Sequence, residues 1–369
     1  MAMHSKNGKD TVMLLGPSLA AVSGVSTHLN QVFSSNLSEQ FNLLHFQVGS
    51  EGRNESAIGK LGRLFLSPAQ FFLRLAKCKP QIIHINTSMH FKSFWRDMVY
   101  FFIAYAMRKK IVYQVHGGQL PHEFLKHSRL LSRLLEKVLL CADVVILLAQ
   151  EELRSYKTFA PTAHLELIAN AVEIGTDASW KINAPAQSRP LRLIYVGRLD
   201  ACKGIFELIE GFEIARRQID NIVLTIAGSG PDEGKLRARV DQLGLAAYVR
   251  FIGVVTGEEK KRAWEDADLF VFPTYAEGLP YALLESMAAR TPPLVSAVGA
   301  ITDVIENGRH GFFIALKNPR ALAEIIVRLD GDRHLICRMG EACRERIVSH
   351  YSIGRLEQDF SRLYRSVMN

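Results

Sequence analysis

Short apolar runs of four to eight residues alternate along the chain with longer stretches in which apolar positions recur every three or four residues. The first pattern favours buried strands and the second favours amphipathic helices. Alternation of the two is typical of parallel sheets built from βαβ units. In the first half, the pattern predicts strands at 11–16, 41–48, 81–86, 111–116, 144–149 and 165–168, with helices at 25–37, 94–107 and 128–140.

The segment 176–190 has no periodicity and is rich in Pro, Ser and Asn, which indicates a linker. After it, strands are predicted at 191–197, 222–228, 249–253, 269–273 and 293–297, and helices at 205–217, 319–330, 334–351 and 352–367. We therefore expect an α/β protein with two doubly wound, parallel-sheet domains. Their expected bounds are 1–178 and 190–351, with a C-terminal helix at 352–369 that packs back towards the N-terminal domain.

Composition narrows the class of protein. A chain of 369 residues with 48% hydrophobic residues is long enough for two cores. The five cysteines form no CxxC pair, as expected for reduced thiols in the cytoplasm. The N-terminus is polar rather than signal-like, and the longest apolar stretch, 98–107, is too short for a bilayer. We expect a cytoplasmic protein without a membrane-spanning segment.

The net charge of +8 is concentrated in the first half of the chain. Residues 1–175 contain 19 Lys and Arg against 12 Asp and Glu, and residues 53–110 contain 11 against two. Such an imbalance predicts an anionic partner. No nucleic-acid-binding motif accompanies it, so nucleic acid is not expected. An anionic membrane surface, or an acceptor that carries phosphate, fits better.

Two carboxylates flank a predicted helix start in the segment 277–285, whose sequence is EGLPYALLE. Pro280 suits a first helical position because its missing N–H would have no partner there. Glu277 then precedes the helix and Glu285 lies in its second turn, both near the positive helix terminus. Carboxylates beside backbone N–H groups suit a ligand that carries hydroxyls and phosphates.

Two cations follow the strand predicted at 191–197, in the segment 197–204 (GRLDACKG). A guanidinium and an ammonium, here Arg198 and Lys203, are the usual partners of phosphate. A further glycine turn, 227–231, has the sequence AGSGP and is not GxGxxG, so a dinucleotide-binding fingerprint is not supported.

Together, the glutamate pair and the basic pair resemble those of the GT-B retaining glycosyltransferases of family 4, the glycosyl transferases group 1. The resemblance covers nearly the whole chain and implies two Rossmann-like domains facing a central cleft. It implies that Arg198 and Lys203 bind the donor diphosphate, and that Glu285 binds the ribose hydroxyls. Glu277 would contact the donor sugar and phosphate together with the amides of Gly278 and Leu279.

The resemblance extends to other segments. The turn at 227–231 resembles the one that lines the nucleotide pocket, and 251–253 resembles the segment beside the nucleobase. The flexible loop that runs from Gly16 through Ser23-Gly24 into the first helix would approach the donor phosphate and the acceptor, and His116 would contact the donor sugar. The expected catalytic residues are His116, Arg198, Lys203 and Glu277, and the expected donor-binding residues are Gly24, Gly197, Gly228, Gly278, Leu279 and Glu285.

We expect neither a metal nor another cofactor. The DxD motif Asp266-Ala267-Asp268 closes a predicted helix instead of following a strand, and Arg198 with Lys203 can neutralise the diphosphate. A second pattern concerns membranes: Ser67-Pro68-Ala69-Gln70 has the form of a capping box that opens a helix to about Lys77. This is either an ordinary domain helix or one that lies in an anionic membrane interface with Phe71 and Phe72 inserted.

The expected function is transfer of a hexose-type sugar, with retention, from a nucleotide diphosphate donor to a lipid-linked or polysaccharide acceptor in bacterial surface glycan synthesis. A UDP-sugar is favoured over a GDP-sugar. The enzyme would act in the cytoplasm, with peripheral attachment to the inner face of the plasma membrane. Two alternatives stay open at this point: a GT-B fold sugar-nucleotide epimerase and a non-catalytic nucleotide-sugar binding protein.

Overall fold

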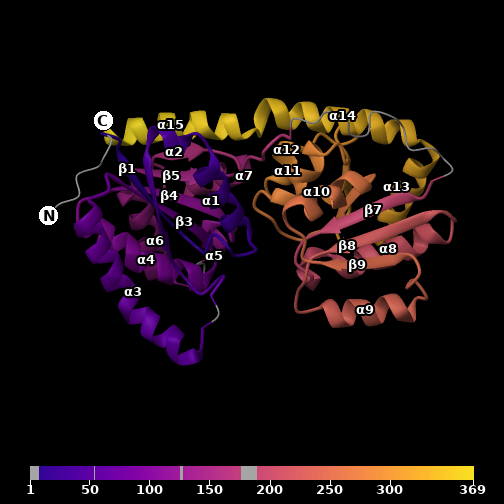
Figure 1. Cartoon of the computed structure of the whole chain (residues 1–369), viewed down its shortest axis with the longest axis horizontal. Helices are drawn as coiled ribbons and strands as arrows, with labels where there is room; N and C mark the ends of the chain where they lie inside the picture. Colours follow the sequence, from indigo (N-terminus) through magenta and orange to yellow (C-terminus); the bar gives the residue numbers. More distant parts are fainter. Residues whose placement is uncertain (1–7, 54, 125–127, 176–188) are drawn as a thin grey trace. The chain divides into compact units, whose positions relative to one another are not determined.

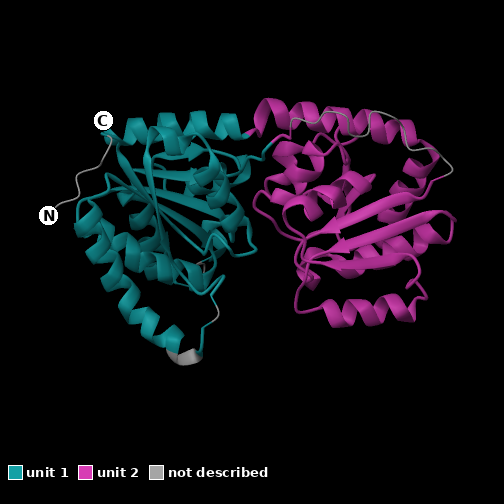
Figure 2. Ribbon diagram, in the orientation of Figure 1, with its two compact units in different colours: residues 1–173, 353–369 teal, residues 174–352 magenta. Residues whose placement is uncertain are grey.

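The computed structural model describes residues 8–53, 55–124, 128–175 and 189–369. Most of the expected linker, 176–190, lies outside these residues. The chain divides into two compact units (Figure 2). Unit 1 comprises residues 1–173 and 353–369, and unit 2 comprises residues 174–352.

Unit 1 is built on a six-stranded parallel sheet with the order β2-β1-β3-β4-β5-β6. The strands are β1 (Thr11–Gly16), β2 (Asn42–Gln47), β3 (Ile82–Met89), β4 (Lys110–Gly118), β5 (Val144–Leu147) and β6 (Leu165–Leu167). Every residue of β1 is buried. The strand therefore reads as a continuous apolar run, because helices cover both faces of a parallel sheet.

Helices cover the two faces of this sheet (Figure 1). One face carries α3 (Ala57–Cys78), α4 (Phe91–Ala106) and α6 (Arg129–Cys141), whose apolar residues share a core with Met13 and Leu15. The other face carries α1 (Gly24–Ser34), α2 (Leu37–Gln40) and α15 (Ile353–Met368), which share a core with Val12 and Leu14. Two short helices, α5 (Pro121–Phe124) and α7 (Gln150–Phe159), complete the unit.

The last helix of the chain belongs to unit 1. Phe360 and Tyr364 of α15 are fully buried, and their rings stack at a centroid distance of 5.6 Å. The hydroxyl of Tyr364 lies 2.7 Å from Nδ1 of His84 on β3. This helix is therefore part of the core and not a tail.

Unit 2 contains a second six-stranded parallel sheet, with the order β12-β11-β10-β7-β8-β9. Its strands are β7 (Leu191–Val196), β8 (Ile222–Ala227), β9 (Val249–Gly253), β10 (Leu269–Phe272), β11 (Pro293–Ser296) and β12 (Phe312–Ile314). Its helices are the 3-10 turn η1 (Ala201–Lys203), α8 (Ile205–Arg216), α9 (Glu233–Gln242), α10 (Gly257–Asp266), α11 (Tyr281–Ala288), α12 (Ile301–Val304), α13 (Pro319–Gly331) and α14 (Arg333–His350).

The strand order reverses once in each sheet. The reversal falls between β1 and β3 in unit 1, and between β7 and β10 in unit 2. In open parallel sheets, ligands bind outside the carboxyl ends of the strands at this point. The loops that follow β7 and β10 are therefore where a ligand of unit 2 is expected, and they contain the basic pair and Glu277.

The predicted start of one helix is wrong. The capping box at Ser67 does not open a helix, because α3 begins ten residues earlier and is capped by Ser56, whose side chain accepts from the backbone N–H of Gly59. Ser67 lies buried in mid-helix and accepts a hydrogen bond of 2.9 Å from the hydroxyl of Tyr100. Phe71 is fully buried against Tyr100, so it is not available to a membrane.

Candidate functional site

The loops after β7 and β10 meet through an ion pair. The ammonium of Lys203 contacts Oε1 of Glu277, and it lies 3.5 Å from the carbonyl oxygen of Ala276. The hydroxyl of Thr274, which is fully buried, donates to the same Oε1 at 3.1 Å. The side chains of Lys203 and Glu277 are 22% and 14% exposed, so the pair is largely shielded but can be reached by a ligand. The structure thus joins one member of the basic pair to one member of the glutamate pair.

Glycines allow these loops to approach so closely. Gly204 has a φ of +68°, and a Cβ atom there would lie 2.0 Å from the carbonyl oxygen of Pro273. Gly299 has a φ of +52°, and its Cβ would lie 1.9 Å from the carbonyl oxygen of Glu277. Only glycine satisfies both the positive φ and the lack of space. Gly204 precedes the segment 273–277 in the sequence and Gly299 follows it, and both lie directly against its backbone.

Gly197 and Gly228 join the ends of β7 and β8. The N–H of Gly197 donates to the carbonyl of Ala227 at 3.0 Å. Gly228 has a φ of +138°, and a Cβ there would lie 1.8 Å from the carbonyl oxygen of Gly197. These contacts give both glycines a role in packing the two loops. A role in donor binding stays a prediction.

Arg198 differs from Lys203 in its surroundings. Its side chain is 68% exposed, and Nε lies 3.8 Å from the carboxylate of Asp200. Its backbone is anchored, because the hydroxyl of Tyr195 donates to its carbonyl oxygen at 2.7 Å. The guanidinium is therefore an exposed charge on a fixed loop, and the structure does not bring it into the Lys203–Glu277 pair.

Glu285 lies in the second turn of α11, as expected, although the helix begins at Tyr281 and Pro280 precedes it in an extended conformation. Lys260 of α10 reaches Oε1 of Glu285 at 2.6 Å, and the two side chains are 29% and 18% exposed. Burial raises the pKa of Glu285, whereas the Lys260 charge and a hydrogen bond from Trp264 lower it. Lys260 thus favours the ionised form of a carboxyl group that burial disfavours.

Gly278 and Leu279, which follow Glu277 directly, are held in place by the same fold. Gly278 accepts a hydrogen bond of 3.2 Å at its carbonyl oxygen from the N–H of Ala300. Leu279 is 5% exposed and belongs to the apolar interior. Their expected contact with a donor through backbone N–H groups stays a prediction.

His116 and Gly24 belong to unit 1. Nε2 of His116 lies 2.9 Å from Oδ1 of Asn86, and the amide nitrogen of Asn86 donates to the carbonyl of Leu15 at 3.1 Å. This second bond fixes the amide orientation, so Oδ1 is the acceptor and Nε2 of His116 carries the proton. Burial lowers the pKa of His116 well below its usual value, and the neighbouring His28 and His84 add to the effect. The imidazole is neutral at pH 7.

Gly24 does not lie in an open loop. It is the first residue of α1, directly after Ser23, whose side chain caps the helix by accepting from the N–H of Ser26 at 3.3 Å. The flexible loop that we expected here therefore ends one residue earlier. Its approach to a ligand stays a prediction.

The DxD motif is occupied by structural contacts. Asp268 is buried; its carboxylate pairs with Arg189 at 2.6 Å and accepts from the N–H of Arg192 at 2.9 Å. Asp266 points to solvent and lies 3.5 Å from the guanidinium of Arg192. Within the described part of the chain, no group of three or more His, Cys, Asp or Glu residues is arranged to hold a metal ion.

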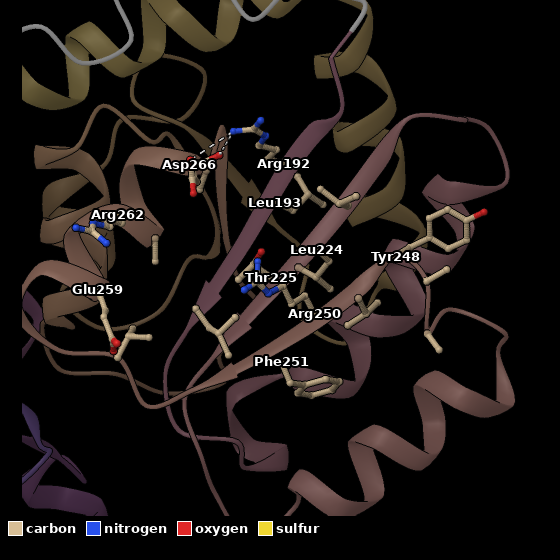
Figure 3. A pocket seen from close by; sticks show the side chains of 18 of the residues that line it. Arg192, Leu193, Leu224, Thr225, Tyr248, Arg250, Phe251, Glu259, Arg262 and Asp266 are labelled. Carbon is tan, nitrogen blue, oxygen red and sulfur yellow. Dashed lines mark hydrogen bonds and ion pairs between the residues drawn. The ribbon is translucent and has the colours of Figure 1, made fainter.

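A separate groove of about 940 Å³ lies over the β7–β9 strands beside α10 (Figure 3). It is lined by mixed charges, among them Arg192, Arg250, Glu259 and Arg262. Phe251, which belongs to the segment expected beside a nucleobase, also lines it, and the guanidinium of Arg237 lies 4.2 Å from the centre of its ring. None of the predicted catalytic or donor-binding residues lines this groove.

Comparison with known proteins identifies the family. Residues 178–346 match the model of the family described as glycosyl transferases group 1. This segment is a glycosyl transferases group 1 domain. The match contains the Lys203–Glu277 and Lys260–Glu285 pairs, and over this segment it confirms the resemblance to glycosyl transferases group 1. Family 4 and retention stay predictions.

Two curated relatives support the family. The chain is 30% identical over 218 residues to an uncharacterized glycosyltransferase, MJ1607, of Methanocaldococcus jannaschii, covering 56% of this chain and 55% of that protein. It is 30% identical over 173 residues to the amylovoran biosynthesis glycosyltransferase AmsK of Erwinia amylovora, covering 45% and 42%. The chain thus spans about half the length of the curated relatives it matches.

A solved structure matches nearly the whole chain. Anabaena HepE, determined in complex with UDP and glucose, superposes with a TM-score of 0.75 at 17% identity and covers 96% of this chain and 99% of that protein. At this identity the match shows the fold alone. The expected GT-B architecture of two doubly wound α/β units is confirmed.

Several residues of the group 1 domain site were not predicted from the sequence. Lys260 lies in a charged run that is typical of a solvated helix face, and its partner Glu285 is 25 residues away. Thr274 carries no motif. Gly204 and Gly299 could have been found, because a single glycine in the connection that follows a predicted strand often marks a turn or a close backbone approach.

Proposed function

We propose that this chain is a retaining glycosyltransferase of family 4 that moves a hexose-type sugar from a nucleoside diphosphate donor to an acceptor hydroxyl. The observation that carries the proposal is the arrangement of two lysine–glutamate pairs, Lys203–Glu277 and Lys260–Glu285, in the group 1 domain. The first pair lies at the point where the strand order reverses, where a doubly wound sheet binds its ligands.

In this proposal Lys203 exchanges partners when the donor binds. Without a ligand, its charge is compensated by Glu277. A diphosphate carries more charge than a carboxylate and offers more acceptor oxygens, so it is the stronger partner for the ammonium. Glu277, released from Lys203, can then accept hydrogen bonds from hydroxyls of the donor sugar. Arg198, exposed on the same loop, adds a second cation to the diphosphate.

Glu285 is proposed to hold the ribose. An ionised carboxylate accepts two hydrogen bonds from neighbouring hydroxyls, and Lys260 favours that ionised form. Such contacts are equal in the ground state and the transition state, so they bind the donor without accelerating the reaction.

The chemical step needs stabilisation of the departing diphosphate more than a protein nucleophile. Preorganised cations at the leaving group supply such stabilisation. We propose that Lys203 and Arg198 do so without a metal, and that the leaving phosphate takes the acceptor proton on the face from which the acceptor attacks. His116, with its proton on Nε2 directed to Asn86, keeps Nδ1 as an acceptor for a hydroxyl of the donor sugar.

For the substrates, we propose a UDP-sugar and a lipid-linked or polysaccharide acceptor in bacterial surface glycan synthesis, at an anionic membrane surface. The solved complex of HepE contains UDP and glucose, and the name of AmsK refers to synthesis of a polysaccharide. The basic excess of residues 53–110 supports an anionic acceptor environment.

A thermal-shift panel of nucleotide sugars tests donor binding, because a bound donor stabilises the folded state by mass action. We expect one UDP-sugar to raise the melting temperature in EDTA, and Lys203→Ala to reduce the shift. Full loss of transfer in EDTA, restored by magnesium or manganese, would contradict metal-free catalysis. Conversion of the donor sugar without an acceptor would instead support an epimerase.

A further inference from the structure

The helices on one face of the unit 1 sheet carry an unusual number of exposed apolar side chains. Large hydrophobic residues that are at least 38% exposed number 14 in the described part of unit 1 and three in that of unit 2. Thirteen of the 14 lie on α3, α4 and α6. We define the α3–α4 surface as Leu61, Leu64, Phe65, Leu66, Phe72 and Leu73 of α3 with Phe91, Trp95, Val99, Phe102 and Tyr105 of α4.

The apolar residues of α4 form a continuous stripe. Phe91, Trp95, Val99, Phe102 and Tyr105 follow one another at intervals of three or four residues, which places them along one side of the helix. The opposite side, with Phe94, Phe101 and Ala104, is fully buried in the core. The helix is therefore apolar on two sides, of which only one is explained by the fold of unit 1.

α3 extends the same surface. It packs against α4 through the ring contact between Phe71 and Tyr100, whose centroids lie 5.3 Å apart. In Figure 1, the N-terminal turns of α3 project beyond the other helices of this face. Those turns carry Leu61, Leu64 and Phe65, which are between 61% and 73% exposed. A contiguous exposed patch of this kind marks an interaction site.

Exposed cations border the apolar residues. Lys60, Arg74 and Lys77 of α3 and Lys92 of α4 are exposed and form no ion pair with a described residue. The two acidic residues of the region are already neutralised, since Glu55 pairs with Arg63 and Asp97 pairs with Arg96. The surface thus combines insertable aromatic and aliphatic groups with uncompensated positive charge.

We propose that the α3–α4 surface docks into the interface of an anionic lipid bilayer. Amphipathic helices with basic margins and Phe, Trp or Leu on the apolar side lie in the plane of such an interface. Trp95 and Tyr105 suit the level of the lipid headgroups. In the described part of the chain no helix is long and apolar enough to cross a membrane, so this attachment is to the surface.

A second copy of the chain fits this surface less well. A two-fold interface would bring the same basic residues of both copies together, and like charges there oppose association. An anionic bilayer instead satisfies both features, because its headgroups attract the cations and its acyl region receives the apolar groups. The proposal places the membrane partner of the proposed transferase on specific residues, yet docking can be measured without donor or acceptor.

Co-sedimentation of the full chain with vesicles tests the proposal. We expect binding to phosphatidylcholine vesicles that contain phosphatidylglycerol, and much weaker binding to phosphatidylcholine alone. Each basic residue near an anionic surface contributes about fivefold to partition. Lys60→Glu, Arg74→Glu and Lys77→Glu combined should therefore weaken binding by on the order of a hundredfold or more. Arg320→Glu, an exposed position in unit 2, is the matched control and should change little.

The apolar part has its own variants. Leu64→Gln, Phe65→Gln and Phe72→Gln replace exposed side chains and should weaken binding without lowering the melting temperature. Val254→Gln, Leu316→Gln and Val348→Gln replace the three large apolar residues that are exposed in the described part of unit 2, and they should leave binding unchanged. The fluorescence of the wild type should shift to shorter wavelength on vesicle binding, and Trp95→Phe should remove most of the shift.

Three results would overturn the proposal. The first is equal binding to neutral and anionic vesicles, and the second is unchanged binding by the α3 variants. The third is a dimer in sedimentation velocity that the Leu64, Phe65 and Phe72 variants convert to a monomer, which would assign the surface to a second copy. If the chain does not bind vesicles but binds a UDP-sugar, the docking proposal fails and the proposed function stands. If it binds anionic vesicles but no UDP-sugar, the proposed function fails and the docking proposal stands.

Discussion

The two units share one architecture and differ in the chemistry at the same place. Each sheet has six parallel strands and one reversal of strand order. Beside the reversal, unit 2 has the ion pair Lys203–Glu277, whereas unit 1 has the uncharged contact between His116 and Asn86. The comparison teaches that the fold determines the position of a candidate ligand site. The side chains at that position determine whether the site offers charged groups or neutral hydrogen-bonding groups.

The outer surfaces differ as well. Among the described residues, unit 1 has most of the exposed large apolar side chains, all but one of them on the helices of a single sheet face, whereas unit 2 has three. Both units have buried apolar cores, so the greater apolar exposure of unit 1 is not explained by a missing core. In our proposals, the difference separates the unit that binds a charged donor from the unit that docks on an anionic surface.

The largest expected effect tests the charge in unit 2. Lys203→Ala should lower kcat by about 10²–10³, as does removal of one preorganised electrostatic contact in other active sites. Steady-state kinetics with saturating donor measures this change. Arg320→Ala removes an exposed charge elsewhere in the same unit and serves as control. Near-normal turnover of Lys203→Ala would show that the charge at the strand-order reversal is not used for chemistry.

A smaller effect concerns binding at the second lysine–glutamate pair. Lys260→Met removes the charge that lowers the pKa of Glu285, so burial should raise this pKa further. UDP affinity should then fall on the order of tenfold, since hydrogen bonds to charged groups contribute about 1.5–3 kcal/mol. As the pH falls, UDP affinity should also begin to decrease at a higher pH than in the wild type.

Calorimetric titration of UDP between pH 8 and pH 5 measures this pH profile. Lys260→Arg keeps the positive charge and should restore the wild-type profile. An unchanged profile in Lys260→Met would mean that Lys260 only packs against α11 and does not control the charge of Glu285.

A third effect concerns stability, and it compares the two units as the pH falls. Burial lowers the pKa of His28 to about 4 and that of His84 to about 3. An unfolded histidine has a pKa near 6.5, so below that pH the unfolded chain binds protons that folded unit 1 does not. As the pH falls from about 6.5 to the folded pKa, each histidine therefore lowers the free energy of unfolding of unit 1 by about 1.4 kcal/mol for each pH unit.

Amide hydrogen exchange at pH 6.5 and pH 5 separates the two units. Protection in unit 1 should fall more than protection in unit 2. His28→Leu should reduce this difference, whereas His334→Asn, an exposed position in unit 2, should not. Parallel loss of protection in both units would show that the buried histidines are not the cause.

Much of the fold could be predicted because buried parallel strands have a strong sequence pattern. The strand at 249–253 was predicted at its observed bounds, and the other predicted strands of unit 2 differ by one residue at an end. β12, with three residues, is too short to give a pattern. The helix start at Ser67 was wrong because its hydroxyl satisfies a tertiary partner, Tyr100, instead of the helix terminus.

The site could be predicted only as far as motifs extend. The glutamates and the basic pair stand in recognisable segments, but the contact between Lys203 and Glu277 spans 74 residues. The contact between Lys260 and Glu285 joins a polar helix to a buried one. Periodicity shows which side of a helix is apolar. It does not show which charged residue, distant in the sequence, will pair with a residue of that helix. The same limit explains why Phe71 seemed available to lipid: the burial of one side of α3 depends on Tyr100.

The position of the last helix has a consequence for how the chain becomes a folded protein. Unit 1 starts at the N-terminus but needs α15, whose Phe360 and Tyr364 close its core. On the ribosome, domains usually fold in the order in which they are made. Here the segment 174–352 is synthesised whole before residues 353–369 exist. The core of unit 1 therefore cannot close until residues 353–369 have been made, and the nascent chain exposes this apolar face while unit 2 is synthesised.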